Sequence, residues 1–271
     1  MRRLDSAPFE RPPTDQLPDD ADDFIRDALT RPIEIVHQDE HLIAVFKPAG
    51  LMVHRGPMSG PDEPVLLQTL RDQIGAYLYP VHRLDRPTAG LILFGLTSEG
   101  AKRLGDLFET RQVRKTYEAL VRGWVTESGE IDRPLRSGPE DQATTQEASD
   151  GPERAAVTRY RPRRRFETPW PIGEFPTSRF THLELEPLTG RWHQLRRHLN
   201  HLAHPILGDH RHGDHRWNQA FFATTGVYRM LLTAVRLEFP HPFDGRPMRL
   251  EVGRGTESDA ALAKLEPFAV V

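Results

Sequence analysis

A single carboxylate surrounded by cations is the feature of this sequence that most strongly suggests chemistry. Asp85 lies in the segment HRLDRPTAG, residues 82–90, between Arg83 and Arg86 and just before a run of apolar residues. Neighbouring guanidinium groups favour the ionised form of a carboxyl group and lower its pKa. An ionised carboxylate can act as a nucleophile or accept a proton, whereas the simpler alternative is a surface ion-pair cluster. Other polar segments must decide between these interpretations.

Four further polar segments accompany this one along the chain. They are Lys47–Gly50 (KPAG), Lys115–Tyr117 (KTY), Gly190–Arg196 (GRWHQLR) and His204–Asp209 (HPILGD). Together with HRLDRPTAG they resemble, in order and spacing, the motifs of the RluA class of RNA pseudouridine synthases. Five ordered motifs are much more specific than any one of them alone. The chain is therefore identified, by resemblance over residues 33–253, as a member of that class.

The resemblance implies roles for three residues. Asp85 would be the catalytic carboxylate, Tyr117 would lie against the target base, and Arg196 would pair with Asp85 and hold it ionised. A guanidinium suits the last role because its planar fork binds a carboxylate through two N–H groups. The reaction breaks the N1–C1′ bond of uridine and rejoins the base through C5, so no cofactor and no metal are expected. The residues leave open whether Asp85 attacks C1′ or removes the 2′ proton.

Seven residues are predicted to contact RNA. A base inside a stem must leave the stack to be modified, and Arg83 resembles the family residue that fills the vacated space. The other six lie in the catalytic segment, in the KPAG segment or in the basic stretch at residues 159–166. They are His82, Arg86, Lys47, Arg163, Arg164 and Arg165. For the basic stretch, a solvent-exposed strand edge is an equally good interpretation.

Narrower features bear on the RNA substrate. The segments at residues 54–75 and 196–214 resemble a subgroup of the class that acts on tRNA, on a T-stem uridine expected to be uridine-65. Ribosomal RNA is the alternative, because the catalytic motifs are shared among enzymes for both RNAs. The chain departs from the family at Thr233, where a histidine is usual, and in a long acidic N-terminal extension. We expect the change at Thr233 to leave Asp85 and its partners unaffected.

The overall charge does not decide whether RNA is the partner. The net charge is −3, yet residues 1–30 hold eight acidic residues and four arginines, a local −4, which leaves about +1 for residues 31–271. RNA binding depends on local basic patches more than on net charge. The chain has no cysteine, no secretory signal and no apolar run of about 18 residues. A cytoplasmic, monomeric protein without a membrane partner is expected.

The hydrophobic pattern predicts the elements that position these segments. Apolar runs at residues 33–36 and 41–46 predict a hairpin before Lys47, and the run at residues 91–96 predicts a central strand after Asp85. Periodic apolar spacing also predicts several helices and strands further along the chain. These are helices at residues 66–74, from Thr97 or Ser98 to Phe108, and 192–203, and strands at residues 116–125, 180–190, 230–239 and 247–252.

These elements predict a protein of the α/β class, α+β in type, with a mixed, largely antiparallel sheet and flanking helices. Its catalytic domain is expected to span residues 32–253. Residues 1–31, rich in proline and aspartate, are predicted to be a disordered extension. The acidic segment at residues 126–155 is predicted to be a mobile loop, and residues 254–271 a tail or short helix.

Two functions without this chemistry are the alternatives. A metal hydrolase is suggested by six histidines, but no HExxH pattern is present and the ligand spacing is poor. The six are His198, His201, His204, His210, His212 and His215. A non-catalytic RNA-binding protein would keep the arginines, yet it would not need Asp85 and Tyr117 together. An esterase is disfavoured because the sequence lacks GxSxG.

Overall fold

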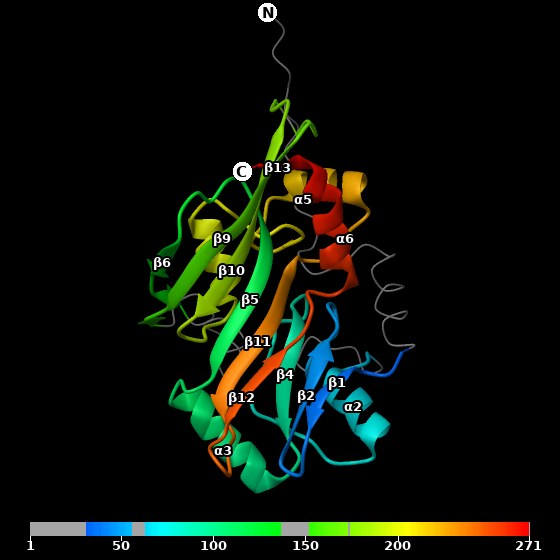
Figure 1. Cartoon of the computed structure of the whole chain (residues 1–271), viewed down its shortest axis with the longest axis vertical. Coiled ribbons are helices and arrows are strands. Elements are labelled where there is room, and N and C mark those ends of the chain that lie inside the picture. Colours follow the sequence, from blue (N-terminus) through cyan, green and yellow to red (C-terminus); the bar gives the residue numbers. More distant parts are fainter. Residues whose placement is uncertain (1–30, 56–62, 137–151, 173, 271) are drawn as a thin grey trace, which may run out of the picture.

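A long twisted sheet forms the centre of the molecule. The computed structural model describes residues 31–55, 63–136, 152–172 and 174–270, and within them eleven strands join into one sheet. Figure 1 shows the strands following the long axis of the chain. Of the predicted N-terminal extension, residues 1–31, only Arg31 belongs to the described residues.

Eight strands follow one another across the sheet. In order they are β1 (Ile35–Gln38), β2 (Leu42–Lys47), β4 (Ala89–Gly95), β11 (Leu232–Pro240), β5 (Arg114–Arg122), β10 (Ser178–Pro187), β9 (Val157–Thr168) and β13 (Ala269–Val270). Beside them, β12 (Pro247–Glu251), β3 (Tyr79–Pro80) and β6 (Gly129–Asp132) pair with β11, β4 and β9. Among the described strand pairs of this sheet, β4 and β11 run parallel and the others antiparallel. The predicted mixed, largely antiparallel sheet is confirmed.

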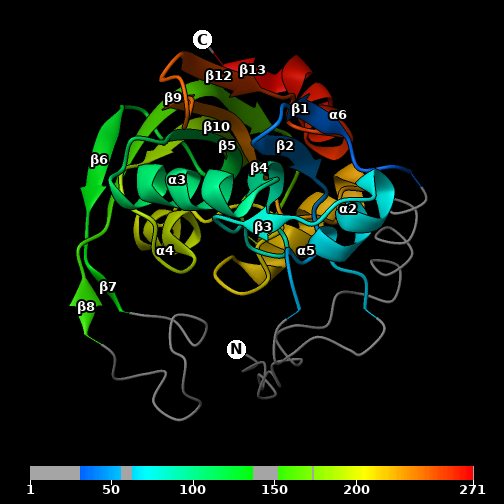
Figure 2. The same cartoon turned by 90° about the horizontal axis from the view of Figure 1, so that it is seen from below.

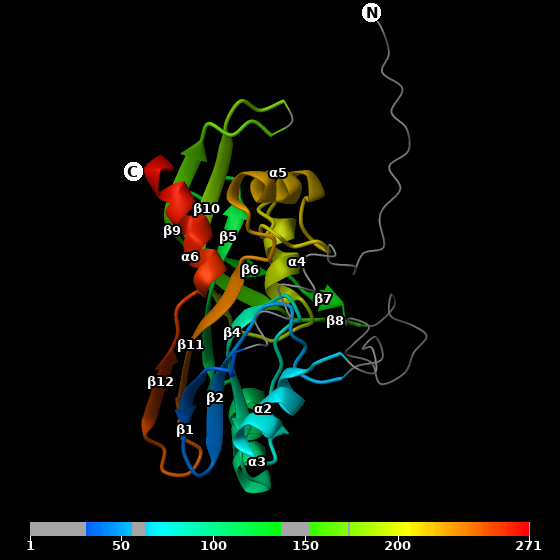
Figure 3. The ribbon, with the colours of Figure 1, turned by 90° about the vertical axis from the view of Figure 1, so that its right-hand side faces the viewer.

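Helices cover the two faces of the sheet. They are α2 (Leu66–Ile74), α3 (Ser98–Glu109), α4 (Gln194–His201), α5 (His215–Thr225) and α6 (Thr256–Leu265), with the 3-10 turn η2 (Glu266–Phe268) after α6. In Figure 2, α2, α4 and α5 lie on one side of the sheet and α6 on the other. Figure 3 shows the same division, with β5 and β10 between α4 and α6.

The alternation of side chains along the strands explains this arrangement. On β10, Leu183 and Leu185 pack against Leu199 of α4, whereas Phe180 packs with Ala261 of α6. Successive residues of a strand point to opposite faces, so one strand supplies both cores. All five side chains are fully buried, and burial of a large apolar side chain contributes about 1.5–3 kcal/mol.

The acidic segment at residues 126–155 is more ordered than predicted. Its residues 129–132 form β6, which pairs with β9 and buries Ile131. Gly129 suits this pairing because a side chain there would collide with the ring of Tyr160. The segment also contributes a second, small sheet, in which β7 (Leu135–Arg136) pairs with β8 (Glu153–Arg154). Residues 137–151, the middle of the predicted loop, lie outside the described residues.

Two helix starts show how local chemistry sets the elements. Thr97 caps α3, as its side chain accepts a hydrogen bond of 3.0 Å from the backbone N–H of Gly100, which confirms the predicted start. The helix predicted at residues 192–203 instead begins at Gln194. His193, directly before it, has a left-handed backbone with φ of 50°, which is incompatible with a helix interior.

Candidate active site

Asp85 lies in the turn that leads into β4, on the side of the sheet that carries α2 and α4. Leu84 packs with the buried leucines of α2, and Thr88 donates a backbone hydrogen bond of 3.0 Å to the carbonyl of Asp85. The carboxylate keeps 23% of its side-chain surface exposed. Asp85 is thus held by a tight turn and yet stays accessible from solvent.

Lys47 fastens this turn to the loop that follows β2. Its ammonium group is fully buried and donates to the carbonyl oxygens of Pro48 at 2.8 Å, Leu51 at 2.7 Å and Arg86 at 3.0 Å. In the same place Gly50 donates its backbone N–H to the Arg86 carbonyl at 2.8 Å. Because all three acceptors are backbone carbonyls of the protein, this ammonium has no surface left for RNA. The predicted contact of Lys47 with RNA is therefore wrong, because its side chain is buried.

The guanidinium of Arg86 also serves the turn. Its Nε donates to the carbonyl of Gly50 at 2.9 Å, and Nη2 forms an ion pair of 2.8 Å with Glu63.

His82, three residues before Asp85, also contacts the backbone. Its Nε2 accepts a hydrogen bond of 2.9 Å from the backbone N–H of Leu93, and burial lowers the pKa of His82 to about 3. His82 is therefore a neutral structural residue and not a cation beside Asp85.

Arg196 of α4 is held between two carboxylates. It donates Nε and Nη2 to Asp209, both at 2.8 Å, and Nη1 to Asp85 at 3.2 Å. Arg196 is 4% exposed and Asp209 is 1% exposed. The predicted pairing of Arg196 with Asp85 is thus present, but the two-pronged contact is made with Asp209. Asp209 belongs to the HPILGD motif, and that motif was the signal that could have marked it as a site residue.

The two carboxylates have opposite pKa shifts. Burial raises the pKa of Asp85 above its ordinary value, and the charge and hydrogen bond of Arg196 oppose this without overcoming it. At Asp209 burial also raises the pKa, but the hydrogen bonds and charge of Arg196 outweigh it and lower the pKa. The expected lowering of the Asp85 pKa is wrong in direction, because burial outweighs the charge and hydrogen bond of Arg196. Asp85 is the more basic of the two groups.

Tyr117 of β5 lies where the two cores of this side meet. It packs against the cluster that contains Leu84 and against the cluster that contains Leu195 of α4. Burial raises the pKa of Tyr117 well above its usual range, and the charge of Asp85 raises it further. The phenol therefore stays protonated, which favours stacking on a base over action as a phenolate.

Most arginines in the basic stretch of β9 lie on the opposite face of the sheet. Arg161 and Arg163 form ion pairs with Glu184 at 2.8 and 3.2 Å, and Glu184 alternates with the inward-facing Leu183 and Leu185. Further along the stretch, Arg164 pairs with Glu266, and the Arg165 guanidinium lies 5.8 Å from the centre of the Trp124 ring. The sheet thus separates the predicted RNA contacts of Arg163 and Arg164 from Asp85. Arg165 pairs in register with Thr181, two residues before Leu183, and lies on the face that carries α4.

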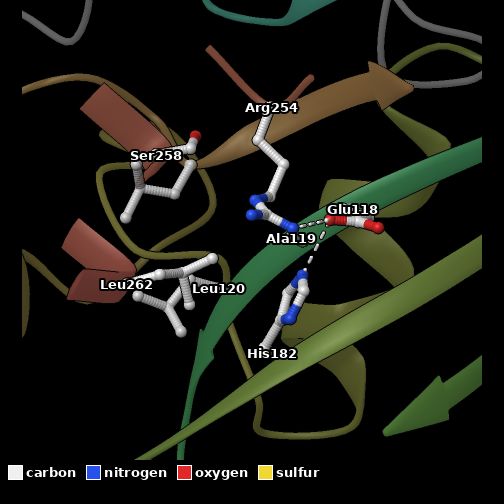
Figure 4. Close-up of a pocket in the computed structure, with 8 residues that line it drawn as sticks. Glu118, Ala119, Leu120, His182, Arg254, Ser258 and Leu262 are labelled. Carbon is white, nitrogen blue, oxygen red and sulfur yellow. Dashed lines mark hydrogen bonds and ion pairs between the residues drawn. The ribbon is translucent and has the colours of Figure 1, made fainter. Parts of the chain in front are cut away.

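Figure 4 shows this outer face at β5. Glu118, the neighbour of Tyr117, accepts hydrogen bonds from His182 at 3.0 Å and Arg254 at 3.1 Å. A hollow of about 10 Å³ beside them has room for no more than about one water molecule. Glu118 and Tyr117 are adjacent in the strand and point to opposite faces, so this hollow is separate from the Asp85 site.

Thr233 also belongs to the outer face. Its hydroxyl donates to the carbonyl of Arg254 at 2.9 Å and accepts from the buried guanidinium of Arg229 at 3.3 Å. The next residue, Ala234, packs instead into the cluster around Leu84. The departure from the family at this position therefore faces α6, away from Asp85.

The histidines that suggested a metal are directed to separate partners. His198 contacts Thr158 and the carbonyl of Arg133, both at 3.0 Å, while His204 contacts the carbonyl of Arg122 at 2.8 Å. In residues 31–55, 63–136, 152–172 and 174–270, no three histidine, aspartate or glutamate side chains gather as metal ligands would. No helix in these same ranges is long and apolar enough to cross a membrane.

One histidine that the sequence interpretation missed lies beside the catalytic candidate. His193 Nε2 is 3.8 Å from Oδ2 of Asp85, and the side chain is 9% exposed. Its position directly before α4, in the GRWHQLR motif, brings it to the same place as Arg196. The motif quoted for Arg196 therefore carries a second residue of the site.

Comparison with known proteins identifies the family of the chain. A family model described as RNA pseudouridylate synthase matches residues 41–201 of the chain. The chain belongs to the RluA class of RNA pseudouridine synthases. Members of this family are isomerases, so the chain is an enzyme of that type.

Relatives and solved structures extend the likeness over most of the chain. It is 46% identical to tRNA pseudouridine synthase C of Salmonella typhi over 221 residues, which cover 82% of this chain and 85% of the relative. The enzyme of the same name from Vibrio cholerae is 43% identical, with 82% and 91% covered. Human RNA pseudouridylate synthase domain containing 4 has a similar structure, with a TM-score of 0.65 and 26% identity over 92% of this chain and 97% of that one.

The buried ammonium of Lys47 generates a prediction about the turn of Asp85. Lys47→Met keeps the length of the side chain but removes the donor to the carbonyls of Pro48 and Leu51, whereas the Arg86 carbonyl keeps the N–H of Gly50. Each buried unsatisfied group costs about 1–3 kcal/mol. We expect a loss of stability of about 2 kcal/mol or more in urea unfolding, and a kcat reduced about tenfold as Asp85 shifts. Lys102→Met, on the exposed face of α3, is the matched control and should change neither.

The pH dependence of stability gives this variant a second measurement. Burial lowers the pKa of Lys47 from 10.5 to about 7, so the unfolded state binds more protons between these pH values. The contribution of Lys47 to stability therefore rises with pH through this window, and below it the contribution stays at its lower level. Lys47→Met should lack this rise. Wild-type kcat together with an unchanged stability profile would contradict the assigned role.

Proposed function

We propose that this pseudouridine synthase isomerises uridine in tRNA, with Asp85 as its catalytic carboxylate. The observation that carries the proposal is the contact of Asp85 with one N–H of Arg196, while Asp209 occupies the other side of that guanidinium. Asp85 is thereby oriented by a cation that is itself fixed. The raised pKa leaves its carboxylate more basic than an ordinary aspartate.

The reaction needs one carboxylate at the sugar and no external reagent. In one route an oxygen of Asp85 attacks C1′ of the ribose as the N1–C1′ bond breaks; in the other it removes the 2′ proton to give a glycal. The freed uracil then turns and bonds through C5 to C1′. In the first route this step breaks the bond between Asp85 and C1′, and in the second Asp85 returns the proton to C2′. The proton lost from C5 is balanced by one gained at N1, so the product is an isomer. Neither route calls for a cofactor or a metal ion.

Tyr117 is proposed to contact the extruded base, and Arg83 is proposed to fill the space that the base leaves in the RNA stem. The protonated ring of Tyr117 would stack on the extruded uracil. Arg83 is exposed two residues before Asp85, at the position where a planar guanidinium can fill the vacated stack. Two further cations lie near the site, since the guanidinium groups of Arg197 and Arg211 are 5.7 and 4.7 Å from the Trp192 ring. We propose that RNA approaches on this side of the sheet.

The substrate is proposed to be one uridine in the T-stem of tRNA, uridine-65. Support comes from the relatives, whose names state that they act on tRNA and which share 43–46% of their residues with this chain. Ribosomal RNA is the alternative, since the catalytic motifs alone do not distinguish the two. The enzyme would act as a monomer in the cytoplasm, with residues 32–253 as its catalytic domain.

The first test removes the proposed catalytic group. Asp85→Asn keeps the shape of the side chain but cannot attack C1′ or accept a proton, so kcat should fall by about 10³-fold or more while tRNA binding persists. Release of tritium from C5-labelled uridine in tRNA measures turnover, and a filter-binding assay measures affinity. Asp106→Asn, exposed on α3, is the control with the same chemical change. Turnover of Asp85→Asn near the wild-type rate would exclude Asp85 from this role.

The second test addresses the RNA. Pseudouridines are mapped in total RNA from cells that lack the gene, and from the same cells complemented with the wild-type chain or with Asp85→Asn. We expect pseudouridine to disappear from one T-stem position of tRNA and to return only with the wild-type chain. Loss of a ribosomal position with tRNA unchanged would contradict the tRNA assignment and leave the chemistry unaffected.

A further inference from the structure

His193 has a backbone conformation that is unfavourable for a residue other than glycine. Its φ of 50° lies in the left-handed region, which costs a non-glycine residue about 1–2 kcal/mol. This backbone turns the imidazole toward Asp85, with Nε2 at 3.8 Å from Oδ2. The ring stacks on Trp192 at 3.9 Å between centres, with an angle of 18° between planes. The strain and the stacking together fix the direction of the ring.

The second nitrogen of this ring has its own partner. Nδ1 of His193 lies 2.8 Å from Nε2 of His212, and the two rings are nearly perpendicular at 85°. The backbone N–H of His212 donates to Oδ1 of Asp209 at 3.0 Å. The aspartate that fixes Arg196 therefore also fixes the residue that holds His193. Both contacts with Asp85, the guanidinium and the imidazole, depend on Asp209.

The charges around the pair determine where its protons lie. Burial and the charge of Arg196 lower the pKa of His193, and burial lowers that of His212 to about 4, so both rings are neutral near pH 7. A neutral imidazole has one N–H and one lone pair. A carboxylate opposite Nε2 of His193 favours the N–H at that nitrogen, which leaves Nδ1 as an acceptor. His212 must then donate its Nε2–H.

We propose that His193 and His212 form a hydrogen-bonded pair of positioning residues that directs an N–H dipole at Asp85. The proposal rests on the catalytic role of Asp85 proposed above. At 3.8 Å the contact is too long for a hydrogen bond, so the effect is electrostatic orientation and stabilisation of the anion. His212 acts through His193 by setting its tautomer. Neither histidine touches the reacting atoms in this scheme.

Variants of His212 test the pair without altering Asp85. His212→Leu removes the donor, and Nδ1 of His193 can then take the proton itself and present a lone pair to Asp85. We expect kcat to fall about tenfold with KM for tRNA changed less than about twofold. His212→Gln places an amide N–H near the former Nε2 and should restore most of kcat. A merely structural role would show no such rescue.

His182 supplies the matched control. It too is a histidine hydrogen-bonded to a side chain, but its partner is Glu118 on the outer face of the sheet. His182→Leu and His182→Gln should both retain wild-type kcat and KM. A loss of kcat in His182→Leu equal to that of His212→Leu would mean that disturbance of any histidine in the fold lowers activity, and it would overturn the proposal.

Nitrogen NMR of the full-length enzyme reads the tautomers directly. With ¹⁵N-labelled histidine, His193 should be protonated at Nε2 and unprotonated at Nδ1. This preference should be lost in His212→Leu. Protonation at Nδ1 in the wild type, or wild-type kcat in His212→Leu, would overturn the proposal. Failure of the proposed function would show instead as an active Asp85→Asn variant. The two failures can be told apart because the tautomer measurement does not depend on turnover.

Discussion

A buried guanidinium shared by two carboxylates is the constraint on which the active side of this protein depends. Arg196 is 4% exposed, so its charge requires partners inside the protein. Removing one partner of such a buried pair typically costs about 3–5 kcal/mol, because the remaining charge is left without compensation. Asp209 accepts from two of its N–H groups and Asp85 from a third. The contacts with Arg196 lower the pKa of Asp209, whereas at Asp85 burial outweighs them and leaves the more basic carboxylate, which is the property a nucleophile or proton acceptor needs.

The fold brings these three residues together from distant parts of the chain. Arg196 and Asp85 are 111 positions apart, and they meet because α4 packs on the same side of the sheet as the turn before β4. Close backbone approach makes the meeting possible. At Gly208, just before Asp209, a Cβ atom would come within 2.1 Å of the carbonyl oxygen of Arg229. At Gly90 it would come within 2.2 Å of the Ala234 carbonyl, where β4 and β11 run side by side.

The sequence alone predicts the sheet class and three site residues, since Asp85, Tyr117 and Arg196 stand in ordered motifs. What it does not predict depends on tertiary partners. Lys47 and His82 are ordinary basic residues by type, and their structural roles come from tertiary partners such as the carbonyl of Arg86 and the N–H of Leu93. The arginines of β9 could be placed only in part, because Arg159, Arg161 and Arg163 alternate with other residues whereas Arg163, Arg164 and Arg165 are consecutive and give no single face. The raised pKa of Asp85 could not be predicted, since it depends first on burial of the carboxyl group in the folded protein and then on the nearby charge of Asp209.

The most direct test of this account is the pKa of the Asp85 carboxyl group, measured by ¹³C NMR in the wild type and in Asp209→Asn. The substitution removes a negative charge that raises the pKa of Asp85, and it releases N–H groups of Arg196. The account predicts a pKa above the ordinary 3.8 in the wild type and a lower pKa in the variant. An Asp85 pKa that is unchanged or higher in Asp209→Asn would contradict the claim that the two carboxylates compete for one guanidinium.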